Sequence, residues 1–197
     1  MRRGILLPVL ALGLVMMLGC RSAAPSGAAE KQTAPEPPVS FSGWALSHQG
    51  VGPVQIGMTL DEANAASGVA FMLPDWGVNP NPPGACAYAY PGGTYDTPVD
   101  LMLNGSTVVR IDVQDRNVQT STGVSVGGST GDVLRLYGGD RVERQPHKYV
   151  EGAEYLIVPP ESLSKETLLL FETDADGRIV EIRVGRDPEV GWVEGCA

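Results

Sequence analysis

The chain has 197 residues, enough for one domain of ordinary size or for two small ones that share a core. It carries 14 basic and 23 acidic residues, a formal net charge of −9, and no basic cluster. This charge argues against nucleic acid or an anionic membrane surface as a binding partner.

The first residues read as an export signal. Two arginines follow Met1, residues 5–17 form an uncharged apolar run, and Leu18-Gly19 stand before Cys20. This order resembles the signal peptide and lipobox of bacterial lipoproteins. The resemblance implies that residues 1–19 are removed and that Cys20 becomes the lipidated first residue of the mature protein.

The lipid would hold the protein on a membrane of the bacterial cell envelope. Arg21, and not aspartate, follows the cysteine, which under the usual sorting pattern of such lipoproteins favours the periplasmic face of the outer membrane. The alternative is a plain secretory signal cut near Ala23 or Ala24. Both interpretations place the mature protein outside the cytoplasm.

Residues 20–40 form a tether. They are rich in Ala, Pro, Ser and Gly and show no apolar periodicity. Such a segment buries too little surface to offset the entropy of ordering it. We therefore expect the folded domain to cover residues 41–197.

Within the domain, one sequence pattern occurs twice. Residues 54–68 read VQIGMTLDEANAASG, and residues 124–138 read VSVGGSTGDVLRLYG. Each contains a glycine, a hydroxyl residue that can cap a helix, an acid three places later and a final glycine that can end the helix in the left-handed conformation. The caps are Thr59 and Ser129, and the helix ends are Gly68 and Gly138.

The repetition continues after each short helix. Alternating strands are predicted at residues 85–91 and 154–160, and hairpins at 99–113 and 167–184. The first hairpin contains Asn104-Gly105, a strong turn signal. The pattern predicts an α+β fold of tandem duplicated units, each a short helix plus antiparallel strands, with halves at about residues 50–115 and 120–197. Two coincidentally capped helices in an unduplicated α+β domain are the alternative.

These motifs resemble known proteins. The turn, cap and short helix followed by antiparallel strands are similar to the units of β-lactamase inhibitory protein and of the small accessory lipoprotein of the outer-membrane barrel-assembly machinery. Residues 108–138 also resemble the middle of envelope-stress-regulated lipoproteins of unknown function. The resemblances concern the fold and bring no catalytic residues with them.

The three cysteines have separate roles in this interpretation. If Cys20 carries lipid, Cys86 and Cys196 form the remaining internal pair, and an oxidising compartment permits a disulfide. Such a bridge would close a loop of about 110 residues, worth about 4–5 kcal/mol in the chain-entropy model. A reactive thiol or a metal site is the alternative.

No catalytic residue, metal site or cofactor is predicted. His48 and His147 lie beside neither a nucleophile elbow nor a cysteine, and no zinc pattern includes them. Residues 172–183 match part of a calcium-loop template but lack its final glutamate, so a hairpin turn is favoured. We therefore expect a protein that is not an enzyme.

An aromatic region interrupts the repetition at residues 73–98. Its candidate binding surface consists of Trp76, Tyr88, Tyr90 and Tyr95, which could present rings to a sugar or to a partner protein. The alternative is that these rings belong to the core. The expected function is non-enzymatic binding or scaffolding at the envelope with a protein or cell-wall glycan partner. The alternatives are an inhibitor of an envelope enzyme and a carbohydrate- or peptidoglycan-binding protein that uses the aromatic region.

Overall fold

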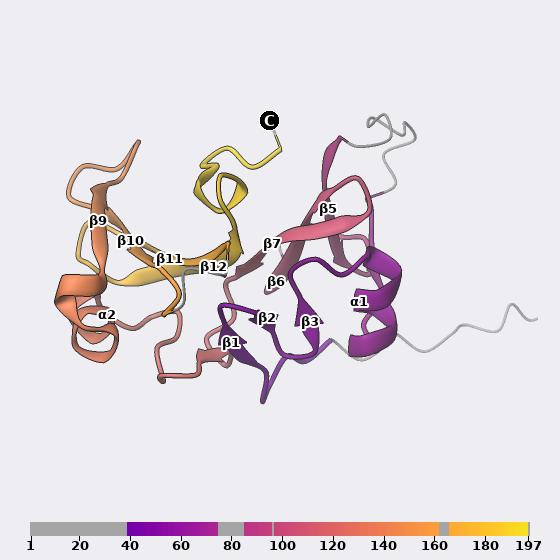
Figure 1. Ribbon diagram of the computed structural model, residues 1–197, viewed down its shortest axis with the longest axis horizontal. Coiled ribbons are helices and arrows are strands. Elements are labelled where there is room, and N and C mark those ends of the chain that lie inside the picture. Colours follow the sequence, from indigo (N-terminus) through magenta and orange to yellow (C-terminus); the bar gives the residue numbers. More distant parts are fainter. Residues whose placement is uncertain (1–38, 75–84, 96, 162–165, 197) are drawn as a thin grey trace, which may run out of the picture. The chain divides into compact units, whose positions relative to one another are not determined.

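The described part of the chain is dominated by antiparallel β-sheet (Figure 1). The computed structural model describes residues 39–74, 85–95, 97–161 and 166–196, all within the compact unit Pro38–Ala197. The expected signal peptide, Cys20, nearly all of the tether and Trp76 lie outside the described residues.

The main sheet has the strand order β4-β5-β6-β7-β12-β11-β10-β9, and all neighbours are antiparallel. The strands are β4 (Phe71–Met72), β5 (Cys86–Pro91), β6 (Val99–Asn104), β7 (Thr107–Val113), β9 (Glu143–Pro146), β10 (Glu154–Val158), β11 (Thr167–Thr173) and β12 (Ile179–Arg186). The earlier four strands form one half and the later four form the other half in reverse order, so β7 and β12 meet at the centre.

The two halves attach their helices to the sheet in the same way. The backbone N–H of Gly57 donates to the carbonyl of Val108 in β7, and that of Gly127 donates to Ile179 in β12, both at 2.8 Å. In return, each strand residue donates to the residue after the glycine, at 2.8 and 2.9 Å. Both glycines have positive φ, 96° and 88°, which other residues rarely adopt.

Both helices begin as the capping boxes predict. Helix α1 (Leu60–Ser67) starts after Thr59, and α2 (Thr130–Tyr137) starts after Ser129. In each box the hydroxyl accepts from the N–H three residues later, and the acid there accepts from the N–H of the cap. The predicted N-caps are therefore confirmed.

The two helix ends differ. Gly68 ends α1 in the left-handed conformation, with φ 69° and ψ 6°, as predicted. Gly138 has φ 84° but ψ 117°, so the expectation of a left-handed helix end there is wrong. Its extended ψ directs the chain into the 3-10 helix η1 (Gly139–Arg141).

The hairpin turns follow the predicted positions with one shift. Asn104 pairs with Thr107, so the two-residue loop is Gly105-Ser106 and not Asn104-Gly105. Gly105 has φ 64°, which explains why the glycine occupies the first loop position. The β11–β12 connection is the predicted hairpin turn, and it is closed by Asp174, whose Oδ1 accepts from two backbone N–H groups.

A small second sheet contains β1 (Ala45–Ser47), β2 (Gly50–Val51), β3 (Val54–Gln55) and β8 (Gln119–Thr120), in the order β3-β2-β1-β8. Strand β8 belongs to the connection between the two halves and pairs with β1 in parallel. The first strands of the domain and this connection are therefore fastened to each other.

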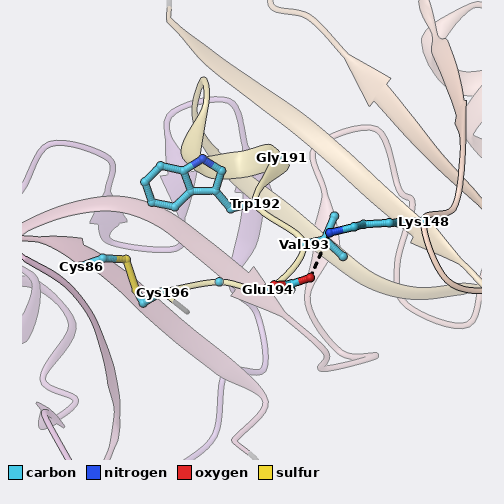
Figure 2. A pocket seen from close by; sticks show the side chains of 8 residues that line it. Cys86, Lys148, Gly191, Trp192, Val193, Glu194 and Cys196 are labelled. Atoms are coloured by element: carbon cyan, nitrogen blue, oxygen red, sulfur yellow. Dashed lines mark hydrogen bonds and ion pairs between the residues drawn. A yellow bond between two sulfur atoms is a disulfide. The ribbon is translucent and has the colours of Figure 1, made fainter.

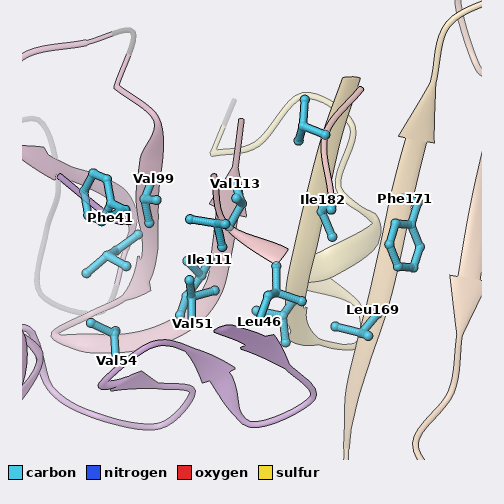
Figure 3. Packing of buried hydrophobic residues seen from close by; sticks show 14 of the residues in the cluster. Phe41, Leu46, Val51, Val54, Val99, Ile111, Val113, Leu169, Phe171 and Ile182 are labelled. Atoms are coloured by element: carbon cyan, nitrogen blue, oxygen red, sulfur yellow. The ribbon is translucent and has the colours of Figure 1, made fainter. Parts of the chain in front are cut away.

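The main core lies between the sheets and helices (Figure 3). Residues of the first face of the main sheet, among them Ile111, Val113 and Ile182, pack against Leu46 and Val51 of the small sheet. Ala63 and Val133 bury one side of each α-helix in the same core. The described domain thus combines two short α-helices with antiparallel strands, as expected, and it contains more strand than helix.

Candidate functional site

The second face of the main sheet carries charged residues at its centre. In β7, Arg110 and Asp112 alternate with core residues, and in β12 Glu181 and Arg183 do the same. With Glu172 of β11 they form what we call the polar row. Arg110, Asp112 and Arg183 are only 3%, 6% and 5% exposed, so these charges are almost fully removed from water.

The charges of the polar row are paired with one another. Arg110 binds Asp112 through two contacts, Nε to Oδ1 at 2.5 Å and Nη2 to Oδ2 at 2.9 Å. Arg183 donates Nη2 to Glu172 Oε2 at 2.5 Å and Nε to Glu181 Oε1. Buried charges are stable only when paired in this manner, so the row is a preformed unit.

The C-terminal segment, residues 187–196, covers part of this face. The remaining Arg110 nitrogen, Nη1, donates to the carbonyls of Glu189 at 3.1 Å and Trp192 at 2.7 Å. Val190 packs with Tyr155 and Leu170 in a small second hydrophobic cluster. The polar row therefore holds the backbone of the segment, which includes the 3-10 helix η2 (Glu189–Gly191).

A disulfide fastens the end of the segment. Cys86 at the start of β5 is bonded to Cys196, with Cα atoms 5.3 Å apart and a sequence separation of 110. The predicted pairing is confirmed. Gly195 packs so closely against the ring of Tyr88 that a Cβ at this glycine would lie 2.9 Å from the tyrosine oxygen.

The loop between β9 and β10 joins the same site through His147. Its Nδ1 accepts from the backbone N–H groups of Tyr149 and Val150, at 3.0 and 3.1 Å. The proton of the neutral ring is therefore on Nε2, which lies 3.1 Å from Glu172 Oε1. The ring also stacks on Tyr155, with centroids 4.6 Å apart. His147 thus connects the loop to the polar row.

An open pocket of about 560 Å³ lies beside the C-terminal segment (Figure 2). Its lining comprises Cys86, Lys148, Gly191, Trp192, Val193, Glu194, Gly195 and Cys196. Figure 2 shows the disulfide, the Trp192 ring and the Lys148–Glu194 ion pair as separate parts of this lining.

Exposed aromatic and charged side chains gather at this pocket. Trp192 is 37% exposed, and Tyr149 is 60% exposed. Lys148 Nζ lies 2.9 Å from Glu194 Oε1 and 4.9 Å from the centroid of the Tyr149 ring, and Tyr149 donates its hydroxyl to the same carboxylate. We call Lys148, Tyr149, Trp192 and Glu194 the Trp192 surface.

Burial changes the acidity of groups beneath the segment. Burial, and then the charge of Asp112, raise the pKa of Glu181 and also raise the pKa of Tyr88 far above its ordinary value. A raised carboxyl pKa occurs in catalytic acids and in buried ion-pair networks alike. Both oxygens of Glu181 are occupied, one by Arg183 and the other by Gln114 at 3.2 Å, which favours the second explanation.

The tyrosines of the predicted aromatic surface differ in burial. Tyr88 donates to Asp112 at 3.1 Å and so belongs to the buried side, and Tyr90 is 8% exposed. Burial raises the pKa of Tyr90 to about 12. Tyr95 is 55% exposed, and its ring lies 4.9 Å from that of Tyr90. Tyr95 alone of these three tyrosines presents most of its side chain to a partner.

The other candidates for chemistry have structural positions. His48 Nε2 lies 3.0 Å from the carbonyl of Val158. The described residues contain no group of three or more His, Cys, Asp or Glu side chains arranged to hold a metal ion. No helix in the described ranges has both the length and the apolar character needed to cross a membrane.

No periodic pattern in the sequence predicts the Trp192 surface. Its residues come from two short segments, residues 148–149 and 192–194, that show no periodicity. One signal was available, because a disulfide between Cys86 and Cys196 has to bring the end of the chain to β5. Trp192, four residues before that cysteine, was the aromatic residue to consider.

The sequence matches no protein-family profile and no curated protein sequence. Among solved structures, it is similar to the uncharacterized protein YfeY from Escherichia coli, with a TM-score of 0.47 and 19% identity over 72% of this chain and 99% of that one. It is also similar to an extracellular protein containing an SCP domain from Bacillus anthracis, with a TM-score of 0.44 and 15% identity over 67% of this chain.

This chain spans 44% of the length of that Bacillus anthracis protein. A third similar structure is the DUF4309 family protein YjgB from Bacillus subtilis, with a TM-score of 0.39 and 13% identity over 73% of this chain and 88% of that one. At this level of similarity, the function of the chain has to be argued from its own residues.

Proposed function

We propose that this protein is a non-enzymatic binding protein of the bacterial envelope and that it holds a protein partner on the Trp192 surface. The observation that carries the proposal is the exposure of Trp192, which lines an open pocket, and of Tyr149, which donates to Glu194 of the same lining. The backbone of this pocket is fastened by Arg110 and by a disulfide. Trp and Tyr are the side chains that most often dominate binding at protein interfaces.

The rigidity of the frame supports binding. A partner loses less affinity when the surface that it meets is already ordered. Arg110 donates to the carbonyl of Trp192, and His147 accepts from the backbone N–H of Tyr149. The backbone of both exposed aromatic residues is therefore fixed by hydrogen bonds to buried side chains. The Lys148–Glu194 pair adds charges of both signs between them.

The pairing of the acid and base groups argues against catalysis. In the polar row, Asp112, Glu172 and Glu181 all face arginines. His147 uses both ring nitrogens for hydrogen bonds. A catalytic acid or base needs access to its substrate, and the C-terminal segment lies over Arg110 at the centre of this face.

Photocrosslinking tests the binding surface. A photoreactive amino acid in place of Tyr149 should yield one defined adduct in intact cells, and Trp192→Ala should abolish it. The same amino acid in place of Val180, which is 42% exposed on β12, is the matched control and should yield no such adduct. Trp192→Ala keeps the carbonyl that Arg110 binds, so the segment should stay in place.

Two results would overturn the proposal. One is the same adducts from positions 149 and 180; the other is an adduct at 149 that survives Trp192→Ala. A photoreactive group at Tyr95 distinguishes the predicted aromatic surface from the Trp192 surface. A change of Trp fluorescence on addition of soluble cell-wall glycans, lost in Trp192→Ala, would replace the protein partner by a glycan.

We infer the envelope location from the lipobox-like start. Export would also supply the oxidising compartment in which the Cys86–Cys196 disulfide is stable. Mass spectrometry of the membrane fraction should find acylated Cys20 at the mature N-terminus. An unmodified N-terminus near Ala23 or Ala24 would refute the lipid anchor.

We also propose that the domain arose by tandem duplication. The support comes from matched pairs of backbone bonds, Gly57 with Val108 and Gly127 with Ile179, and from the reversed strand order of the two halves. In addition, both central strands have a register shift, in the β6–β7 pair and in the β11–β12 pair. If so, the repeated sequence pattern determines the shared fold of the two halves, and the binding residues lie where the halves differ.

A further inference from the structure

A second pocket, of about 290 Å³, lies beside the end of β12. It is lined by His48, Gln49, Gln55, Ile56, Glu166, Thr167 and Arg186. None of these residues belongs to the Trp192 surface or to the polar row. Ligand pockets in proteins begin at about 300 Å³, so this one suits a small molecule.

Arg186 is the cation of this pocket. Its side chain is half-buried and forms no ion pair or hydrogen bond with any residue that the structure describes. By contrast, the buried Arg110 and Arg183 each form ion pairs with carboxylates of the polar row. In a chain with nine more acidic than basic residues, a half-buried guanidinium with no carboxylate partner indicates a place for an external anion.

The turn at Gly57 brings the guanidinium to the pocket. A Cβ at this glycine would come within 3.3 Å of Arg186 Nη2, so the arginine rests closely on the turn. The same glycine is fixed by its bond to Val108 and by its positive φ. The position of the cation is therefore set by backbone geometry.

Further hydrogen-bond donors line the pocket. Gln49 Oε1 already accepts from Ser47 Oγ at 2.8 Å, which leaves its NH₂ group as the free part of the amide. Gln55 contributes a second amide. Glu166 lies at the same pocket and opposes a doubly charged ligand. One guanidinium with amide donors matches one carboxylate, which a guanidinium can bind through two parallel hydrogen bonds.

We propose that this pocket binds a small ligand through a single carboxylate, with Arg186 as the anchoring residue and the side chains of Gln49 and Gln55 as additional donors. The site is independent of the Trp192 surface, so either proposal can fail without the other.

The repeated turn provides a matched control. Arg116 stands against Gly127 as Arg186 stands against Gly57, with its guanidinium carbon 3.7 Å from the Cβ position of that glycine. Arg116 is exposed and does not line the pocket. Arg116→Gln therefore removes an equivalent charge and contact without touching the proposed site.

Titration of the full chain, followed by backbone amide NMR, tests the proposal. The probes are N-acetylglycine, its uncharged analogue N-acetylglycinamide and inorganic phosphate, all at equal ionic strength. N-acetylglycine should shift the amides of Gln49, Gln55 and Thr167 with a saturable Kd of about 1 mM, as expected for a ligand of this size. Arg186→Gln should weaken this binding at least tenfold, and Arg116→Gln should leave it unchanged.

Arg186→Lys is a second variant, which keeps the charge but loses the planar fork, and an intermediate affinity is expected. If Arg186→Gln does not fold, the affinity of Arg186→Lys for N-acetylglycine tests the role of the guanidinium instead. Equal shifts with N-acetylglycinamide, unchanged affinity in both Arg186 variants, or no saturable shift with N-acetylglycine would each overturn the proposal. Tighter binding of phosphate than of N-acetylglycine would overturn the assignment to a carboxylate.

Discussion

At the residue scale, the distinguishing feature is a set of buried charges at the centre of a sheet. Arg110 is the residue on which most of them depend, because it binds Asp112 and also two carbonyls of the C-terminal segment. Breaking a buried pair leaves an uncompensated charge, which is far more costly than loss of an exposed pair.

Arg110→Met should therefore lower the free energy of unfolding by about 3–5 kcal/mol in urea titration. Arg144→Met is the matched control, because it breaks an exposed ion pair with Glu154 and should cost far less than Arg110→Met. The double variant Arg110→Met/Asp112→Leu leaves no lone charge and should be more stable than Arg110→Met alone. Equal costs for the buried and exposed arginines would contradict this account.

Asp132, in the first turn of α2, makes the stability of the folded protein depend on pH. Hydrogen bonds from the Ser129 side chain, and then from Arg135, lower its pKa from 3.8 to about 2. Because the folded-state value is the lower one, the stability that the carboxylate provides is complete above pH 4, and it is lost as the pH falls towards 2.

The thermal midpoint of Asp132→Asn should thus lie below that of the wild type at pH 5, and the difference should shrink as the pH approaches 2. NMR titration of the Asp132 carboxyl carbon in Ser129→Ala should show its pKa rising towards 3.8. A difference that stays constant with pH would show that another effect of the substitution dominates.

At the element scale, the two helices depend on their caps. Each has only eight residues, which is too short for stability without tertiary contacts and capping. Thr59→Ala and Ser129→Ala should each cost about 0.5–2 kcal/mol of unfolding free energy. Ser121→Ala, in an exposed turn, is the control and should change little. Unaltered stability in both cap variants would mean that the capping boxes are not needed.

The sequence predicted these elements because their signals are local. Thr59 and Glu62, or Ser129 and Asp132, stand three residues apart, and the capping bond joins them directly. The centre of the sheet has no such signal, because the β7–β12 pair joins residues from different halves. The alternation in VVRIDV and IVEIRV places Arg110 and Arg183 on one face, but only the register determines which carboxylates they meet.

At the scale of the whole molecule, the disulfide secures the site. It joins the end of the chain to β5 over the second face of the sheet, and it encloses most of the described domain in one loop. It is therefore a covalent cross-link between the Trp192 surface and the first half of the chain.

Cys86→Ser/Cys196→Ser should lower the free energy of unfolding by about 4–5 kcal/mol in the chain-entropy model for a loop of this length. Dithiothreitol should have a similar effect on the wild type and none on the double variant. The reduced protein should also show altered Trp192 fluorescence as the segment loosens. Equal stability with and without reductant would contradict a structural role for the bridge.

The position of β12 has a consequence for how the chain folds. This strand is the last of the sheet in sequence and also one of its two central strands. Until β12 is available, β7 presents an unpaired edge, which is open to association with other chains. Its pairing with a strand from the other half raises the contact order and slows folding. A chain that emerges from its N-terminus onwards therefore completes this domain only at the end, so a partially synthesised molecule is the form most exposed to aggregation.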